Sequence, residues 1–315
     1  MNPDYKIIFQ RNYGIFNQNE QERIRHTGVL IIGATGVGEM ISMILARSGV
    51  EKFVISGEGV YEPSDMNRQI CCFSDTIGQK KVDVIREAIL SINPNAKIVT
   101  HDHLLSENEV DRLIVKADVV IPAVDDFPYS IMLFRAARRY GKPAVLCLPS
   151  GSMGWVSVFT DQGPSIEDVF GIPKLDYKAM HRLMYSREYR CAQYNLITAG
   201  DWQVDWFWNY FKGKRPLPLI CPVEWMLASL AGLEILKIAS RKWPPMHAPR
   251  CWYARRGTVS DSRFNIFLRY HRKLGWLIFG SGIGRRFHKQ ALWFWRHFFE
   301  YLRSRQDKKT RGMTS

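Results

Sequence analysis

The stretch VLIIGATGVG, residues 29–38, indicates the fold class of this 315-residue chain. Its first four residues are apolar and mostly β-branched, which is typical of a strand buried on both faces of a parallel sheet. The glycine-rich turn leads into a helical pattern over residues 40–48, which Gly49 closes, and then into a second strand pattern over 52–56. This order predicts a β-α-β unit.

The alternation continues outward from that unit. Strand and helix patterns follow one another at residues 80–92, 97–100, 106–116, 119–124, 128–140 and 144–148. Repeated β-α-β units with apolar strands predict an α/β protein with a doubly wound, mostly parallel Rossmann-like sheet. A further strand is expected over 155–160 and a long helix over 222–239.

Five segments are expected along the chain. They are an N-terminal segment (1–28), a nucleotide-binding Rossmann-like domain (29–160), a crossover or substrate loop (161–216), a closing helix with the end of the main domain (217–262) and a C-terminal extension (263–315). The crossover segment is polar, aromatic and irregular. An insertion of that kind in a compact domain is usually a functional loop or lid.

The positive charge of the chain is concentrated in its C-terminal extension. The whole chain carries +14, and residues 263–315 hold 13 Lys and Arg against two Asp and Glu, a charge of +11. These cations alternate with large apolar side chains, which predicts a basic amphipathic helix. Three roles stay open: contact with an anionic membrane surface, contact with tRNA phosphates, or packing on the main domain or a dimer partner.

Cysteine spacing and hydropathy argue against a protein that has a cysteine-based zinc site, spans a membrane or is secreted. None of the six cysteines forms a CxxC pair, so no structural zinc site is expected. The longest apolar stretch, 217–236, contains Pro222, Glu224 and Glu234, and predicts a buried helix instead of a membrane span. The charged N-terminal residues do not match a signal peptide. We therefore expect a cytoplasmic protein with reduced thiols, peripheral to the membrane if its tail binds lipid.

The glycine turn is the first candidate for a ligand site. Gly33, Gly36 and Gly38 have the spacing G-x-x-G-x-G instead of the G-x-G-x-x-G of dinucleotide-binding proteins. Small residues at the start of a helix allow backbone amides to approach phosphate oxygens. A generic nucleotide site and a plain tight turn are both compatible with this pattern.

Charged residues further along the chain strengthen the nucleotide hypothesis. Asn67-Arg68-Gln69 follows the second strand, Lys81 opens a helix, and Asp125 follows a later strand. Strand carboxyl ends line the ligand crevice of open α/β sheets, so these residues are expected to converge. Two cations suit a triphosphate from which pyrophosphate leaves, and one carboxylate suits Mg²⁺.

Each of these residues also has a simpler interpretation. Lys81 could be a solvated lysine at the start of a helix, and Asp125 could cap the helix that follows it. Arg68 could form an ordinary surface ion pair, which contributes little to stability. The joint spacing favours the ligand site over these three interpretations taken together.

The ordered set of motifs resembles the ThiF/MoeB adenylyltransferases, which are related to ubiquitin-activating enzymes. The matching stretches are VLIIGATGVG (29–38), EPSDMNRQ (62–69), TIGQKKVDVIREAILSINPNAKI (76–98), VIPAVDDFPYSIMLFRAARRYGKP (120–143) and PLICPVEWMLASLAGLEILK (218–237). The resemblance covers about residues 11–160 and 216–240, and the ordered set is more specific than any single motif.

The resemblance implies an ATP-dependent enzyme that activates a substrate carboxylate as an acyl-adenylate and releases pyrophosphate. Arg68 and Lys81 would hold the phosphates, and Asp125 would hold the magnesium ion. A homodimer is implied as well, in which an N-terminal arginine enters the partner's site, with Arg11 as the candidate.

Three positions depart from the family pattern. Ser56 stands where the family usually has an aspartate for the ATP ribose, and Glu58, two residues on, is a substitute candidate. Asp65 stands where an amide is usual near the phosphates, and Thr35 replaces a usual glycine. These departures keep a degenerate, non-catalytic homologue open as an alternative, since structural ion pairs can also explain such charges.

A cysteine in the crossover segment is a further candidate. Some members of the resembled family carry a catalytic cysteine there that takes the acyl group as a thioester, and Cys191 lies in the corresponding region. Arg187 and Arg190 would lower its pKa and favour the thiolate. An unremarkable loop cysteine is the alternative.

Several substrates and functions stay open. The carboxylate could belong to the C-terminus of a ubiquitin-like carrier protein, to a ribosomally made peptide, or to threonylcarbamoyladenosine in tRNA, as in the corresponding dehydratases. The unusual loop and tail favour a specialised substrate such as a peptide. Outside this class, the alternatives are a nicotinamide-dependent oxidoreductase, whose G-x-G-x-x-G is absent, and a non-catalytic binding module.

Overall fold

The computed structural model describes residues 4–186, 201–211 and 213–264. The chain divides into two compact units, residues 1–169 with 219–264, and residues 170–218 with 265–315. Cys191 and the basic extension from residue 265 onward therefore lie outside the described residues. All candidate site residues other than Cys191 belong to the first unit.

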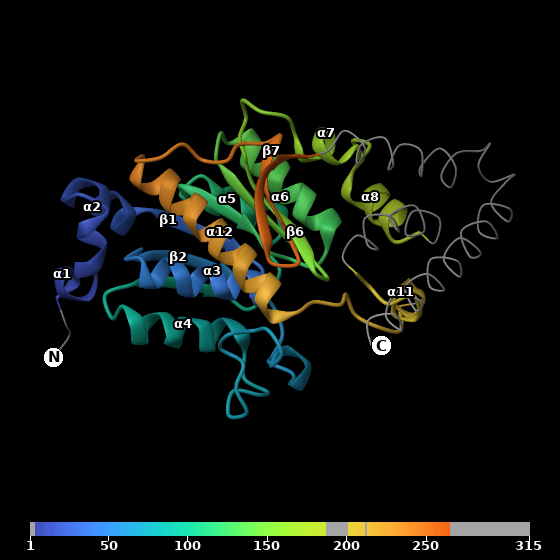
Figure 1. The fold of residues 1–315 in the computed structure, drawn as a ribbon, viewed down its shortest axis with the longest axis horizontal. Coiled ribbons are helices and arrows are strands. Elements are labelled where there is room, and N and C mark those ends of the chain that lie inside the picture. Colours follow the sequence, from blue (N-terminus) through green and yellow to red (C-terminus); the bar gives the residue numbers. More distant parts are fainter. Residues whose placement is uncertain (1–3, 187–200, 212, 265–315) are drawn as a thin grey trace, which may run out of the picture. The chain divides into compact units, whose positions relative to one another are not determined.

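The first unit is built on one eight-stranded sheet with the order β3-β2-β1-β4-β5-β6-β7-β8 (Figure 1). Five strands run parallel: β1 (Gly28–Ile32), β2 (Lys52–Ser56), β3 (Lys97–His101), β4 (Val119–Pro122) and β5 (Ala144–Ser150). Three strands extend the sheet in antiparallel fashion: β6 (Met153–Phe159), β7 (Arg250–Arg255) and β8 (Thr258–Arg263). The predicted α/β class with a mostly parallel, doubly wound sheet is confirmed.

Strand β1 occupies the centre of the parallel part. Val29 pairs in register with Phe53 of β2 on one side and with Val119 of β4 on the other. The strand order reverses at β1, because β2 and β3 follow on one side and β4 and β5 on the other. Ligands of open α/β sheets bind beside such a reversal, outside the carboxyl ends of the strands.

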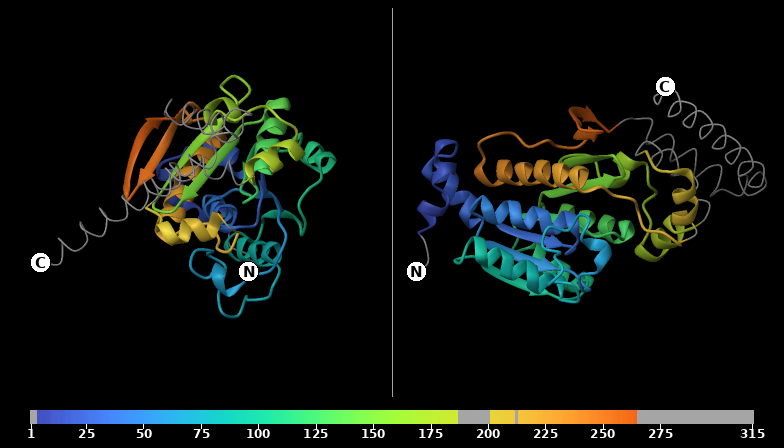
Figure 2. Two further views of the ribbon diagram at one scale, coloured as in Figure 1. Left: turned by 90° about the vertical axis from the view of Figure 1, so that its right-hand side faces the viewer. Right: turned by 60° about the horizontal axis from the view of Figure 1, so that its bottom comes forward.

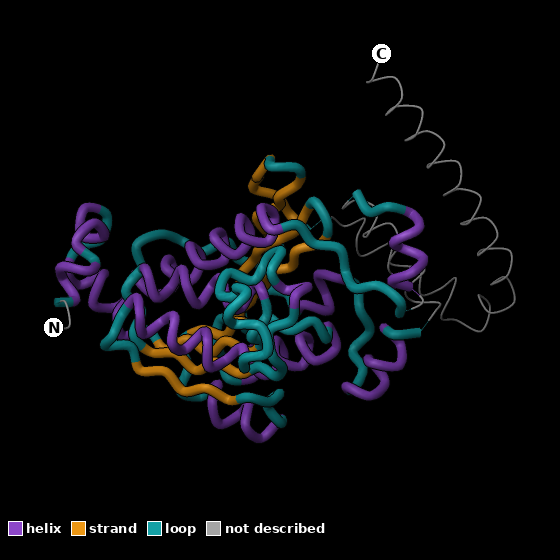
Figure 3. The backbone as a smooth tube through the Cα atoms, turned by 90° about the horizontal axis from the view of Figure 1, so that it is seen from below, coloured by secondary structure: helices purple, strands orange, loops and turns teal. Residues whose placement is uncertain are grey.

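Helices cover both faces of this sheet, as Figures 2 and 3 show. One face carries α3 (Gly36–Arg47), α4 (Lys81–Ile92) and α12 (Cys221–Ser240), and the other carries α5 (Glu107–Ile114) and α6 (Phe127–Arg139). The core between the first three helices and the sheet includes Ile41, Leu45 and Leu227. Gly232 allows α12 to approach α3 closely, because an added Cβ would lie 2.7 Å from Ile44 Cγ2.

Short elements complete the N-terminal part of this unit. They are α1 (Tyr5–Ile8), the 3₁₀ helix η1 (Gln10–Gly14), α2 (Gln18–His26) and the 3₁₀ helix η2 (Pro63–Asp65). Helix α2 is tied to the end of α12, because the Arg23 guanidinium donates to the Ser240 carbonyl through Nε at 3.0 Å and Nη2 at 2.6 Å.

The expected irregular segment 161–216 contains three short helices within its described part. They are α7 (Ile166–Phe170), α8 (Tyr177–Met184) and α11 (Val204–Phe211). Asp176 caps the start of α8 by accepting a hydrogen bond from Ala179 N at 2.8 Å. The sequence predicts no helix here, because the segment is polar and aromatic without a clear helical pattern. Among the described helices, none combines the length and apolarity needed to cross a bilayer.

Candidate active site

The three glycines of the turn after β1 are packed so tightly that a side chain at any of them would overlap a neighbouring atom. Gly33 has a φ of +118°, and its N–H donates to the Ser56 carbonyl of β2 at 2.7 Å. An added Cβ on Gly38 would overlap the Gly33 carbonyl, and one on Gly36 would overlap Glu224 Oε1 of α12. The three glycines therefore let β1, α3 and α12 meet at the carboxyl edge of the sheet.

Thr35, at a position where the family resemblance leads us to expect a glycine, has a structural role. Its hydroxyl donates to the Ala123 carbonyl at 2.8 Å and makes no cap bond to the amides of α3. The first amides of α3 therefore have no side-chain cap from Thr35. Free amides at a helix N-terminus favour an anionic ligand.

Asp65 is the centre of the charged cluster beside this turn. Its carboxylate lies 2.8 Å from Lys81 Nζ and 3.5 Å from Arg68 Nη2. It also accepts hydrogen bonds from Gln69 Nε2 at 2.7 Å and Glu62 N at 3.1 Å. Only about a tenth of the side chains of Asp65 and Lys81 is exposed, 10% and 12%. The interpretation of Lys81 as a solvated lysine is therefore wrong.

Glu224 is a second buried acid in the cluster, and the sequence analysis did not propose it. Arg68 Nε lies 3.6 Å from its Oε2, and the residue is 1% exposed. Within the described part of the chain, neither carboxylate oxygen has a hydrogen-bond partner. Burial raises the pKa of Glu224 to about 7, Arg68 partly offsets this, and the nearby charge of Asp125 adds to it. The detectable signal was a glutamate in the first turn of a predominantly apolar helix.

Asp125 lies three residues beyond the end of β4 and is solvent-exposed. The protein atoms crowded around its carboxyl group still raise its pKa by desolvation, while the charges of Arg68 and Lys81 lower it. The neighbouring Asp126 caps α6 by accepting a hydrogen bond from Tyr129 N at 3.4 Å. Asp125 is therefore not the cap of this helix, and its carboxylate belongs to the same electrostatic cluster as the two cations.

A fourth acid, Glu39, lies on the first turn of α3 and is fully buried. One of its oxygens accepts a hydrogen bond from Cys71 N, and burial raises its pKa. The cluster thus brings four carboxyl groups near two cations. Its members are Glu39, Asp65, Asp125, Glu224, Arg68 and Lys81.

The flanking residues proposed for nucleotide contact have different environments. Ser56 is buried and its hydroxyl donates to the His103 carbonyl at 2.7 Å, so this group is used within the fold. Gln69 is also buried and supports Asp65. Glu58 and Asn67 are exposed, and Asn67 Oδ1 accepts a hydrogen bond from Arg68 Nη1 at 3.0 Å.

Arg11 does not join the cluster within its own chain. It is an exposed residue of η1, and the amide of the adjacent Asn12 donates to the Ser48 carbonyl just past the end of α3. The glycine turn lies at the other end of this 12-residue helix, about 18 Å away along its axis.

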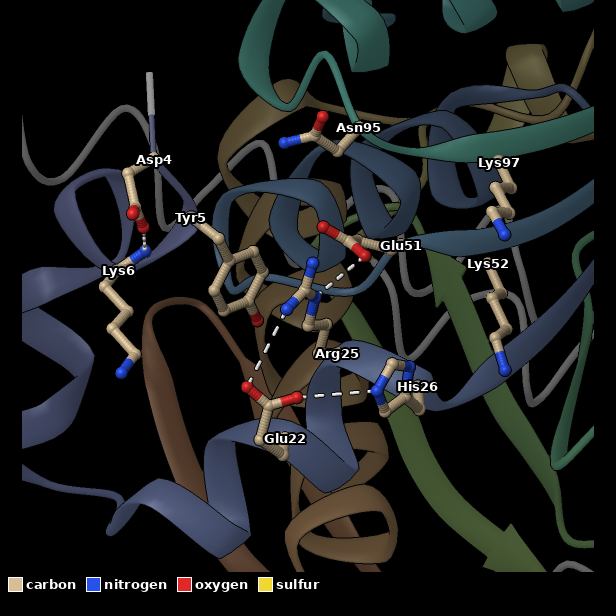
Figure 4. Close-up of a pocket in the computed structure, with 10 residues that line it drawn as sticks. All are labelled: Asp4, Tyr5, Lys6, Glu22, Arg25, His26, Glu51, Lys52, Asn95 and Lys97. Carbon is tan, nitrogen blue, oxygen red and sulfur yellow. Dashed lines mark hydrogen bonds and ion pairs between the residues drawn. The ribbon is translucent and has the colours of Figure 1, made fainter. Parts of the chain in front are cut away.

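A charged pocket lies at the opposite edge of the sheet, where β2 and β3 begin (Figure 4). Arg25 lies between two acids there, 2.9 Å from Glu51 and 3.8 Å from Glu22. Lys52 and Lys97, the first residues of their strands, also line it. It contains none of the predicted site residues, and its edge is the wrong one for a ligand of an open α/β sheet.

The comparison with protein families gives this geometry its context. The ThiF family model matches residues 9–269. The chain belongs to the ThiF family. All six members of its charged cluster lie within the matched region.

Two curated relatives illustrate the sequence similarity of this ThiF-family chain. HesA of Nostoc sp. (strain PCC 7120) is 32% identical over 143 residues, which cover 45% of this chain and 56% of HesA. The adenylyltransferase and sulfurtransferase MOCS3-1 of Zea mays is 28% identical over 160 residues, 50% of this chain and 34% of MOCS3-1. The chain spans about half the length of the HesA proteins that it matches.

Solved structures show the same fold at low sequence identity. MccB of E. coli, solved with ATP, has a TM-score of 0.61 and 16% identity, and the match covers 82% of this chain and 71% of MccB. MccB in complex with N-formylated MccA has a TM-score of 0.62 and 17% identity, with 84% and 75% covered. At these identities the similarity concerns the fold.

Proposed function

We propose that this ThiF-family chain is an ATP-dependent adenylyltransferase, which activates a carboxylate as an acyl-adenylate and releases pyrophosphate. One observation carries the proposal: Arg68, Lys81 and Asp125 lie in one electrostatic cluster beside the glycine turn. They come from three separate segments of the chain, and the carboxyl edge of the sheet is where such folds bind nucleotides. The name of the relative MOCS3-1 supports the same reaction type.

The charges of the cluster fit a triphosphate that is accompanied by a divalent cation. The carboxyl groups of Asp65 and Asp125 already offset the charges of Arg68 and Lys81, so little positive charge is left for a bare triphosphate. The exposed Asp125 carboxylate and the Glu224 oxygens, which have no hydrogen-bond partner among the described residues, are hard oxygen donors, the kind that Mg²⁺ prefers. In this proposal Asp125 holds Mg²⁺, which supplies positive charge next to the phosphates.

Arg68 and Lys81 have a defined task in this reaction. A carboxylate oxygen attacks the α-phosphorus of ATP, the bond to the β-phosphate oxygen breaks, and negative charge moves onto the leaving pyrophosphate. Fixed cations that face this charge stabilise the transition state. Asp65 holds both cations in place through contacts of 2.8 and 3.5 Å, so they are oriented before ATP binds.

We propose as substrate the C-terminal carboxylate of a ubiquitin-like carrier protein or of a ribosomally made peptide. The family membership and the similarity to MccB, solved with MccA, support a protein or peptide substrate. A homodimer is part of the proposal. Arg11 lies at the far end of α3, so a second copy would have to supply it to the site.

ATP–pyrophosphate exchange tests the proposal. The full chain is incubated with ATP, Mg²⁺, labelled pyrophosphate and a peptide library with free C-terminal carboxylates. The same library with C-terminal amides is the matched substrate control, because an amide cannot form an acyl-adenylate. We expect exchange with the free acids only, and a loss of at least about 100-fold in Asp125→Ala.

Asp126→Asn is the matched protein control, since asparagine also caps helices. This variant is expected to retain exchange. Loss of exchange in Asp125→Ala would then be specific to Asp125 and not a general effect of removing an acid at this position. Exchange supported by tRNA but by no peptide would replace the proposed substrate. Absence of exchange with every substrate, together with binding of NADH and not of ATP, would refute the adenylyltransferase proposal.

A further inference from the structure

A second group of functional side chains lies at the end of β3, outside the phosphate cluster. His101 is the last residue of β3, His103 follows two residues later, and Glu109 lies on the first turn of α5. Each offers one ligand atom, and these atoms all lie within 4.8 Å of one another. None of the three takes part in the proposed adenylation chemistry.

Hydrogen bonds to their backbone carbonyls hold the two histidines at this position. The Gly57 N–H donates to the His101 carbonyl at 3.0 Å, and the Ser56 hydroxyl donates to the His103 carbonyl at 2.7 Å. Both contacts tie the end of β3 to the end of β2. The imidazole rings stand nearly perpendicular, with centroids 5.7 Å apart. The segment that presents the two rings is therefore fixed before any ligand binds.

Glu109 is held just as firmly from the other side. Its Oε2 accepts hydrogen bonds from Ser106 N at 2.8 Å and Ser106 Oγ at 2.6 Å, which fixes the start of α5. Its Oε1 lies 3.1 Å from His103 Nε2. The Ser106 hydrogen bonds, with His103 beside them, lower the pKa of Glu109 to about 2, so it is a carboxylate at neutral pH.

One ring nitrogen of His101 lacks a partner. His101 Nε2 is buried, and no hydrogen-bond partner for it exists among the described residues. Buried polar atoms normally have a partner, and a metal ion would provide one. On the other side of His103, Asp102 Oδ1 lies 3.8 Å from Nδ1, and Lys80 holds the same carboxylate at 2.7 Å. A carboxylate behind a ligand histidine is the usual outer partner in metal sites.

We propose that His101, His103 and Glu109 form a binding site for one transition-metal ion, with Zn²⁺ as the reference ion. Two imidazole nitrogens and one carboxylate oxygen suit zinc and its neighbours in the first transition row, and not Mg²⁺ or Ca²⁺. Ligand atoms around a tetrahedral zinc ion lie about 3.3 Å apart, so small side-chain rotations close the site. Three protein ligands leave a fourth position for water or a bound ligand.

This site differs in its ligands from the cysteine-based zinc sites whose CxxC spacing is missing from the sequence. It joins β3 and α5 beside Ser56, the position where the family resemblance places the ribose of ATP. A metal ion there would tie α5 to the sheet edge and stabilise the folded state by mass action. The proposal is independent of adenylation, because binding is measured without ATP.

Competition with a chromophoric chelator, on the full chain stripped of metal, tests the site with Zn²⁺ alone. The wild type is expected to bind one more Zn²⁺ than His101→Gln/His103→Gln. Glu109→Gln is expected to weaken Zn²⁺ binding by at least about 10-fold, while glutamine keeps the helix cap. Co²⁺ in the wild type is expected to show the visible absorption of a low-coordinate site, which the variants lose.

His26→Gln is the matched control. His26 also lies near a single carboxylate, 3.4 Å from Glu22, but it belongs to no three-ligand group in the described structure. It is expected to leave Zn²⁺ affinity unchanged. If the double histidine variant does not fold, as judged by circular dichroism, Glu109→Gln alone decides. Equal Zn²⁺ stoichiometry, affinity and Co²⁺ spectra in the wild type and the folded variants would overturn the proposal.

Discussion

Lys81 Nζ lies 2.8 Å from the Asp65 carboxylate, and Arg68 pairs with the same acid at 3.5 Å. By the family resemblance Asp65 stands where an amide is usual, so the contact joins a residue that departs from the family pattern to the two cations of the cluster. The acid orients both cations and at the same time offsets part of their charge. In the proposed reaction, the affinity for ATP is therefore expected to depend on Asp65 as well as on Lys81.

Replacing Lys81 by methionine tests its part in phosphate binding. Lys81→Met is expected to lower kcat/KM for ATP–pyrophosphate exchange by about 100-fold, because one fixed cation is lost. Lys80→Met is the matched control: Lys80 is exposed and pairs with Asp102 at the surface. Exchange rates within about twofold of each other for the two variants would contradict the assignment.

Replacing Asp65 by asparagine restores the amide that is usual in the family. Asp65→Asn removes one negative charge beside Lys81 and Arg68, and is expected to lower the KM for ATP by at least about threefold. Asp111 is partly exposed and pairs with Arg139 away from the cluster, so Asp111→Asn controls for a change of net charge. A higher KM in Asp65→Asn would show that orientation of the cations outweighs their free charge.

Glu224 makes the stability of the chain depend on pH. Its pKa is raised from 4.5 to about 7, so between these values the folded state keeps a proton that the unfolded state loses. Stability is therefore expected to fall as pH rises from 4.5 to 7, by roughly 3 kcal/mol from this group, and to level off above. Urea unfolding at pH 5, 6, 7 and 8 is expected to show a flatter profile for Glu224→Gln. Glu87→Gln, on the exposed side of α4, is expected to follow the wild type.

The glycine turn predicts a difference between two alanine substitutions. Gly36→Ala and Gly38→Ala are each expected to destabilise the fold by about 2 kcal/mol, since each added methyl group overlaps a packed neighbour. At Gly36 the neighbour is the Glu224 side chain, and at Gly38 it is the Gly33 backbone. Thermal unfolding should therefore show that Glu224→Ala rescues Gly36→Ala and not Gly38→Ala. Gly14→Ala, in open space, is the neutral control.

The sequence alone determined the fold class, the position of the glycine turn and the place where the cations gather. Apolar runs such as 29–32 and 119–124 are local signals of buried parallel strands, and Gly33 marks the turn whichever residues surround it. Because parallel strands end at one edge, Arg68, Lys81 and Asp125 could be expected together without any coordinates. The hairpin of β7 and β8 was not expected, because β8, TVSDSR, lacks an apolar run.

Only the tertiary structure decided which charges face one another. Arg68 and Glu224 lie far apart in the sequence, and α12 brings the buried acid to the cation by packing on α3. Burial raises the pKa of Glu224 to about 7. No local sequence pattern shows that this glutamate is buried. The proximity of His101 and Glu109 also depends on the tertiary structure, because β3 ends where α5 begins, at one corner of the sheet. Pairing and desolvation depend on the surroundings in three dimensions, whereas strands and turns depend on neighbours along the chain.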